Sequence, residues 1–218
     1  LVDEEKLYAS FNESFINAPF YTNHDMARSA GYYANDDGSR TKLAGALNLL
    51  MTGNAFVYYG EEIGMKGSGR DENKRAPMYW ITEDEAAESS AVNQNFGSEG
   101  DGLWNFGPAA DDKMTADLLR KTYGRDLDAI MCKGPEDMES FPMKFGTVYE
   151  QIGEDMSIHT YYRNAIHIRN AFPVIARGKT AVDYDRCNDA ICAMIREDAA
   201  GRYEPVEIFV NSTEHTAS

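Results

Sequence analysis

The sequence predicts an α/β fold that is joined, near residue 178, to a second and all-β part. Three observations point to this organisation. An apolar run over residues 15–22 ends in polar side chains, a helix-spaced apolar stripe begins at Ser39, and a second apolar run over residues 54–64 again ends in polar side chains. A strand, a helix and a strand in this order make one βαβ unit of a parallel sheet covered on both faces.

The first predicted strand is "FINAPFYT", residues 15–22. It is followed directly by Asn23, His24 and Asp25, which place an amide, an imidazole and a carboxylate side by side. The C-terminal ends of parallel strands form one rim, and α/β enzymes hold their chemistry at that rim. The triplet is therefore the first candidate site.

A helix is predicted from Ser39 onward, with Gly53 as its C-terminal stop. Apolar residues recur there at helical spacing, at Leu43, Ala46, Leu47, Leu50 and Met51. The second strand, "NAFVYYGEEIG", follows over residues 54–64 and ends in Glu61 and Glu62. Adjacent residues of a strand point to opposite faces, so these two glutamates are not predicted to act on one bond.

The loop after the second strand is "GMKGSGRDENKRAPMYW", residues 64–80. It carries Asp71 and Arg75 four residues apart, a spacing that also fits a plain solvated ion pair. Its glycines do not indicate a phosphate loop, because Glu72 occupies the position of a third glycine.

The remaining segments are assigned by composition and spacing. Residues 81–112 are predicted to be loop, and residues 113–131 a poorly defined helix. Residues 155–172 have better helical spacing and stop before a proline. The β-branched runs 190–197 and 205–212 predict two strands that pair antiparallel.

Composition excludes several classes of function. The formal net charge is -15, with 36 carboxylates against 21 Lys and Arg, so a nucleic-acid partner is not expected. No apolar run is long enough for a transmembrane helix. The three cysteines do not have the spacing of a zinc site. The start, "LVDEEKLYAS", lacks both an initiator Met and a signal-peptide pattern, so we expect it to lie inside a longer protein.

Four segments resemble the C-terminal part of the α-amylase family, glycoside hydrolase family 13. In order they are "FYTNHDMAR", "KLAGALNLLMTGNAFVYYGEEIGMKG", "RDENKRAPMYW" and "YYRNAIHIRNAFPVIARG". The resemblance implies a partial (β/α)8 TIM barrel, comprising the last βα units, followed by a truncated antiparallel β-sandwich domain. Residues 1–177 would belong to the barrel, with an irregular insertion over about 81–146, and residues 178–218 would begin the sandwich.

The resemblance also implies roles for five residues. Asp25 matches the family's third catalytic carboxylate, which holds the vicinal hydroxyls of the sugar at the bond that breaks. His24 would donate a hydrogen bond to the same sugar, and Asn23 would brace its neighbours. Asp71 and Arg75 match a pair that contacts the next sugar. The implied activity is retaining hydrolysis of α-glucans such as starch and maltooligosaccharides.

The family's nucleophile and acid/base lie upstream of the matching segments, so this chain is expected to be a fragment without activity of its own. Alternatives are an α-1,6-acting or exo-acting α-glucosidase of the same family, or a non-catalytic amylase-like binding or ancillary module. The absent barrel portion or another chain would cover the open strand edges. No cofactor is expected within the chain, and calcium is an expectation for the full-length protein. A polymeric substrate suggests secretion or the cell surface, with the cytoplasm as the alternative.

Overall fold

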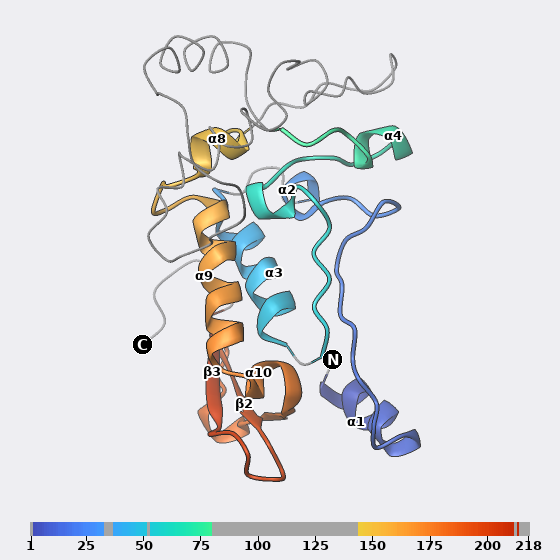
Figure 1. Cartoon of the computed structure of the whole chain (residues 1–218), viewed down its shortest axis with the longest axis vertical. Helices are drawn as coiled ribbons and strands as arrows, with labels where there is room; N and C mark the ends of the chain where they lie inside the picture. The colour runs from blue at the N-terminus through green and yellow to red at the C-terminus, as the bar shows by residue number, and fades with distance from the viewer. Residues whose placement is uncertain (1, 33–36, 52, 80–143, 212, 214–218) are drawn as a thin grey trace, which may run out of the picture. The chain divides into compact units, whose positions relative to one another are not determined.

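The computed structural model describes residues 2–32, 37–51, 53–79, 144–211 and 213. Within these ranges the chain has more helix than strand and contains one antiparallel sheet (Figure 1). In chain order the elements are α1 (Val2–Phe11), α2 (Ser29–Tyr32), α3 (Ser39–Leu50), the 3-10 helix η1 (Glu61–Ile63), α4 (Asp71–Lys74), α8 (Val148–Gln151), α9 (Ile158–Ala171), α10 (Val174–Arg177), β1 (Lys179–Val182), the 3-10 helix η3 (Tyr184–Arg186), β2 (Ile191–Glu197) and β3 (Val206–Asn211).

The two best-defined helices of the sequence, α3 and α9, are both formed and lie side by side (Figure 1). Gly45 allows this close approach, because a Cβ added there would lie 2.3 Å from the ring of Tyr162. At the C-terminal end of α3, the Arg169 guanidinium of α9 donates to three backbone carbonyls, those of Leu49, Met51 and Gly53. One side chain thus satisfies carbonyl groups that the helix end leaves without an intrahelical donor.

The chain divides into two compact units, each assembled from segments that are separated in the sequence. The first unit contains Leu1–Tyr21, Ala46–Val57 and Asn164–Ser218, and the second contains Thr22–Gly45 and Tyr58–Arg163. The sheet belongs to the first unit, and the residues singled out for chemistry belong to the second.

The sheet of the first unit has the strand order β1-β2-β3, with both pairs antiparallel. Met194 in the central strand pairs with Val182 of β1 and with Ile208 of β3. The predicted antiparallel pairing of residues 190–197 with 205–212 is therefore formed, by β2 and β3. The sequence did not predict β1, which covers the other edge of β2.

The predicted strands over residues 15–22 and 54–64 were wrong as strands. The two segments are nevertheless bonded to each other, since Asn54 N donates to Asn17 O at 2.7 Å and Phe56 N donates to Pro19 O at 3.1 Å. Pro19 has no N–H, so it cannot return the reciprocal bond to Asn54 that a parallel ladder requires. The bonds between the segments therefore run in one direction only.

The expected burial of the phenylalanine side chains in these two segments was also wrong. Phe20 is 55% exposed and Phe56 is 58% exposed. A parallel strand is buried when elements cover both of its faces. More than half of the surface of each of these residues is instead open to solvent.

The second unit is built around a small apolar core. Its buried members come from η1, the loop after it and α8, and they are Ile63, Met65, Ala76, Val148 and Ile152. Thr147 and Glu150 form a capping box at the start of α8, each side chain bonding the other's backbone N–H. This core supports the loop of residues 64–79. No helix among the described residues is long and apolar enough to cross a membrane.

Candidate functional site

The structure brings together all five residues that the sequence singled out, and we call Asn23, His24, Asp25, Asp71 and Arg75 the Asp25 cluster. Arg75 is its centre, because Nη2 lies 3.0 Å from Asp25 Oδ1 and Nη1 lies 3.4 Å from Asp71 Oδ2. His24 Nε2 lies 3.3 Å from the other carboxylate oxygen of Asp25. One guanidinium therefore joins two carboxylates that lie far apart in the sequence.

Local backbone structure sets the positions of these side chains. The Asn23 side-chain oxygen accepts a hydrogen bond from Asp25 N at 2.9 Å, and Met26 N donates to Asn23 O at 3.2 Å. This is an Asx-type turn, in which Asn23 shapes the backbone that presents Asp25. Asp71 opens α4 and Arg75 follows its last residue, so the two are neighbours on one helical face.

The cluster is open to solvent. The exposed fractions of the side chains are 61% for His24, 63% for Asp25, 60% for Asp71 and 43% for Arg75. Exposed ion pairs of this kind contribute little to stability, so a ligand can compete for them. Hydrogen bonds from Lys74, and then from Arg75, lower the pKa of the Asp71 carboxyl, which keeps it ionised at neutral pH.

Two tyrosines, Tyr58 and Tyr59, hold the backbone of the cluster. Tyr58 Oη donates to Lys74 O at 3.0 Å, and Tyr59 Oη donates to Ala76 O at 2.8 Å. These carbonyls lie on either side of Arg75. The sequence carries no local signal for the contact, because the tyrosines and their acceptors are 16 and 17 residues apart.

Arg28 was missed as well, although it belongs to the quoted segment "FYTNHDMAR". Its side chain is fully buried, and its guanidinium carbon lies 4.9 Å and 4.7 Å from the ring centroids of Tyr58 and Tyr59. Nε donates to Tyr59 O at 3.0 Å, and Nη1 donates to Lys66 O at 3.3 Å. A buried cation with partners of this kind is a structural centre, and an arginine is usually predicted to be exposed.

The two glutamates after the second segment lie on the 3-10 helix η1, so the prediction that they sit on a strand was wrong. Gly60 and Gly64 flank η1 with φ of 88° and 66°, a conformation that favours glycine. Glu61 is fully buried and accepts bonds from Ser29 N at 2.9 Å and from Ser29 Oγ at 2.5 Å. Burial raises the pKa of the Glu62 carboxyl.

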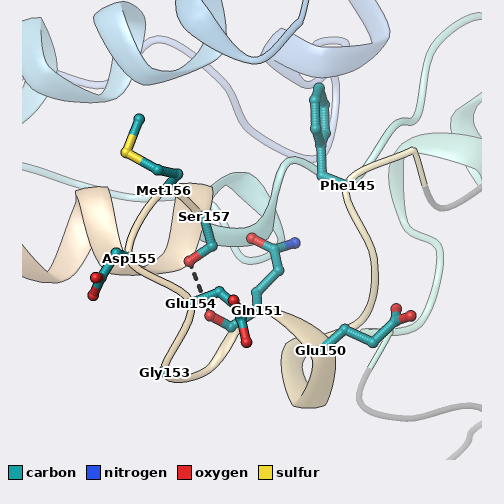
Figure 2. A pocket seen from close by; sticks show the side chains of 8 residues that line it. All are labelled: Phe145, Glu150, Gln151, Gly153, Glu154, Asp155, Met156 and Ser157. Atoms are coloured by element: carbon teal, nitrogen blue, oxygen red, sulfur yellow. Dashed lines mark hydrogen bonds between the residues drawn. The ribbon is translucent and has the colours of Figure 1, made fainter.

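A separate pocket of about 350 Å³ lies at the turn between α8 and α9 (Figure 2). It is lined by Phe145, Glu150, Gln151, Gly153, Glu154, Asp155, Met156 and Ser157. Several of its polar groups serve the local fold, since Glu150 Oε2 accepts from Thr147 N and Ser157 Oγ donates to Gln151 O. None of the predicted site residues lines this pocket.

The described residues contain no group of three or more His, Cys, Asp or Glu side chains arranged to hold a metal ion. Trp80, the loop predicted over 81–112 and the helix predicted over 113–131 lie outside the described residues, as does nearly all of the insertion predicted over 81–146.

Comparison with known proteins gives consistent matches. The family model of the α-amylase catalytic domain matches residues 4–102. α-Amylase 3 of Dictyoglomus thermophilum is 41% identical over 77 residues, which are 35% of this chain and 15% of that protein. The glucan 1,6-α-glucosidase of Streptococcus dysgalactiae is 44% identical over 52 residues, which are 22% of this chain and 10% of that protein.

The solved structure of Amy13B from Eubacterium rectale superposes with a TM-score of 0.69 and 37% sequence identity, covering 96% of this chain and 32% of that chain. A solved α-amylase from H. orenii superposes with a TM-score of 0.57 and 23% sequence identity, covering 95% of this chain and 33% of that chain. The chain spans about a third of the length of these two structures and a smaller share of the two sequence relatives.

Proposed function

We propose, on the premise that the chain belongs to the α-amylase family, that it provides the sugar-binding edge of an active site that hydrolyses α-glucans with retention of configuration. Starch and maltooligosaccharides are the proposed substrates. The supporting observation is the Asp25 cluster, in which carboxylate, imidazole and guanidinium groups lie together, open to solvent. A sugar offers several hydroxyls to such a cluster and carries no charge.

In the proposed reaction, a nucleophilic carboxylate attacks the anomeric carbon while a carboxylic acid protonates the departing oxygen. Asp25 accepts hydrogen bonds from two vicinal hydroxyls of the sugar at the bond that breaks. These bonds strengthen as positive charge develops on the ring, so they stabilise the transition state more than the ground state. His24 donates to the same sugar, and Asn23 holds the turn.

Asp71 and Arg75 are proposed to contact the next sugar. Arg75 can donate to hydroxyls in a fixed planar geometry, and Asp71 can accept from them. The exposed pairing of these two residues leaves both with capacity for a ligand. Their contribution would be to binding along the glucan and to the orientation of the leaving group.

The nucleophile and the general acid are proposed to lie in a barrel portion outside this sequence. Exposed apolar side chains on the extended segments support this, among them Ile16, Phe20, Phe56 and Val57. Burying such surface is favourable, so the remaining barrel portion or another chain would cover it. We also propose export from the cell or display on its surface, because starch is a polymer outside cells, and a calcium site in the full-length protein.

Two alternatives have different support. Hydrolysis of α-1,6 bonds, or exo-acting glucosidase chemistry, is favoured by the similarity to the glucan 1,6-α-glucosidase. A non-catalytic binding or ancillary module is less favoured, because a module that serves only as a scaffold has no need of an exposed cluster such as Asp25, His24 and Arg75.

The test is an assay of reducing-sugar release from starch, maltooligosaccharides and an α-1,6-linked glucan. The full-length protein that contains these 218 residues should release sugar, and the 218-residue chain alone should not. Release from the α-1,6 glucan alone would favour the first alternative. Binding of maltooligosaccharides without turnover by the full-length protein would favour the second, and turnover by the isolated chain would contradict the assignment of the missing carboxylates.

A further inference from the structure

We infer that Tyr58, Tyr59 and Arg28 are positioning residues, which hold Arg75 in the orientation that joins Asp25 to Asp71. The inference rests on the proposed function in one respect, namely that Arg75 contacts the substrate. It goes further in assigning a role to three side chains that touch no proposed substrate group. Each link is a contact within the second unit.

We call the contacts of Tyr58, Tyr59 and Arg28 that hold Arg75 the clamp. Its first part fixes the backbone. The two tyrosine hydroxyls bond the carbonyls immediately before and after Arg75, at 3.0 Å and 2.8 Å. The Arg75 backbone N–H also bonds Glu72 O at 3.1 Å. The main chain at residue 75 is thus fixed from both sides and at its own amide.

A clamp of this kind is needed because the side chain of Arg75 is long and 43% exposed. An exposed ion pair is weak, and fixing an arginine side chain costs conformational entropy. The pairs with Asp25 and Asp71 alone therefore do not define one orientation. Fixing the backbone reduces the range of positions that the guanidinium can reach.

The two tyrosines can act together because the chain turns where they lie. Consecutive residues of a regular strand would point to opposite faces. Here the chain turns at Tyr59 and Gly60, and both hydroxyls reach the same loop. The rings contact each other, with centroids 4.7 Å apart. Burial raises the pKa of Tyr58, so its hydroxyl remains a donor at neutral and mildly alkaline pH.

The Arg28 guanidinium contacts both tyrosine rings. Its guanidinium lies within 5 Å of both ring centroids and is fully buried, so the rings cannot shift without exposing or stranding a buried cation. Gly67 lets the loop close over this arginine, because a Cβ there would lie 2.7 Å from Arg28 Nη1. Arg28 N also donates to Gly67 O at 3.0 Å.

These contacts connect the segment that presents Asp25 to Arg75 in two ways. Arg28 follows Asp25 by three residues in the chain, so the segment that presents Asp25 also carries the support for the tyrosines. The tyrosines hold the backbone of Arg75, and Arg75 returns to Asp25 through its guanidinium. A disturbance at the hydroxyls should therefore reach the substrate contacts mainly through Arg75.

The experiment measures kcat and KM of the full-length protein on maltooligosaccharides. Tyr58→Phe, Tyr59→Phe and the double variant are made with Arg75 intact and again with Arg75→Ala. The control is Tyr184→Phe, which removes a hydroxyl from η3 in the other unit. Thermal midpoints are recorded for every variant, and the two single variants provide the result if the double variant does not fold.

With Arg75 intact, we expect kcat/KM of the double variant to fall about tenfold, mostly through a higher KM. A loss of this size corresponds to the free energy of about one hydrogen bond. In the Arg75→Ala background the same changes should lose less than about twofold, because residues that act through one group are not additive. The control should match the unmodified protein.

Three outcomes would overturn the inference in different ways. Equal losses in both backgrounds would show a general structural role for the tyrosines. No loss with Arg75 intact would show that the clamp does not affect the site. An Arg75→Ala variant with unchanged kcat/KM would remove Arg75 from the proposed substrate contacts, which is a failure of the proposed function and not of the clamp geometry, and the inference would fall with it.

Discussion

Replacing Asp25 by asparagine is the most direct perturbation of the proposed chemistry. Asp25→Asn in the full-length protein keeps the shape of the side chain and removes its charge. The structure adds a second effect, because both carboxylate oxygens have a neighbour: Oδ1 accepts from Arg75 Nη2, and Oδ2 lies 3.3 Å from His24 Nε2. An amide supplies one acceptor and one donor, so one of the two partners would face a donor.

The magnitude follows from the bonds that are lost. A hydrogen bond to a charged group exceeds a neutral one by about 1–2 kcal/mol. Two vicinal sugar hydroxyls therefore correspond to about 2–4 kcal/mol of transition-state stabilisation, which is roughly 30-fold to 1000-fold in rate. The mismatch with Arg75 or His24 favours the upper part of this range. We expect kcat to fall by several hundredfold, on the order of 3–4 kcal/mol, with a smaller change in KM.

The assay is steady-state release of reducing sugar from maltooligosaccharides, with Asp71→Asn as the matched control. Asp71 contacts the neighbouring sugar in the proposal, so its loss should change KM more than kcat. An Asp25→Asn protein with full kcat, or a pair of variants with the same profile, would refute the assignment of Asp25 to the sugar at the bond that breaks.

Two further predictions concern stability. Arg169→Met removes the donor to three carbonyls at the end of α3 and should lower the free energy of unfolding by roughly 3 kcal/mol. The thermal midpoint should then fall by about 6–12 °C. An unchanged midpoint in a calorimetric scan would contradict this. Glu62 has a raised pKa in the folded state, so the folded state binds more protons and stability is lost as pH rises above 4.5, the unperturbed value. Glu62→Gln should therefore raise the midpoint at neutral pH but not below pH 4.5, and an equal effect at both pH values would argue against burial as the cause.

The sequence was most informative where local chemistry decides the structure. Helical spacing from Ser39 and over residues 155–172 located α3 and α9. The β-branched runs located β2 and β3. The spacing of Asp71 and Arg75 is a helical spacing, and α4 realises it. Each of these signals lies within a few residues of the feature that it predicts.

The sequence was least informative where partners come from distant segments. Pro19 was part of the first predicted strand, and its missing N–H was the available signal against a parallel ladder. Gly60 and Gly64 on either side of two glutamates were the available signal for η1 in place of a strand. By contrast, the burial of Arg28 and the acceptors of the tyrosine hydroxyls depend on tertiary contacts that no local pattern encodes.

The ion pairs among Asp25, Asp71, Lys74 and Arg75 also decide how a ligand arrives. These four charges sum to zero, whereas the whole chain carries -15. The site therefore exerts no long-range pull on an uncharged glucan, whose encounter rate should be set by diffusion and change little with ionic strength. Because the chain as a whole is strongly acidic, we expect a uronate or sulfated polysaccharide to bind less well than a neutral glucan.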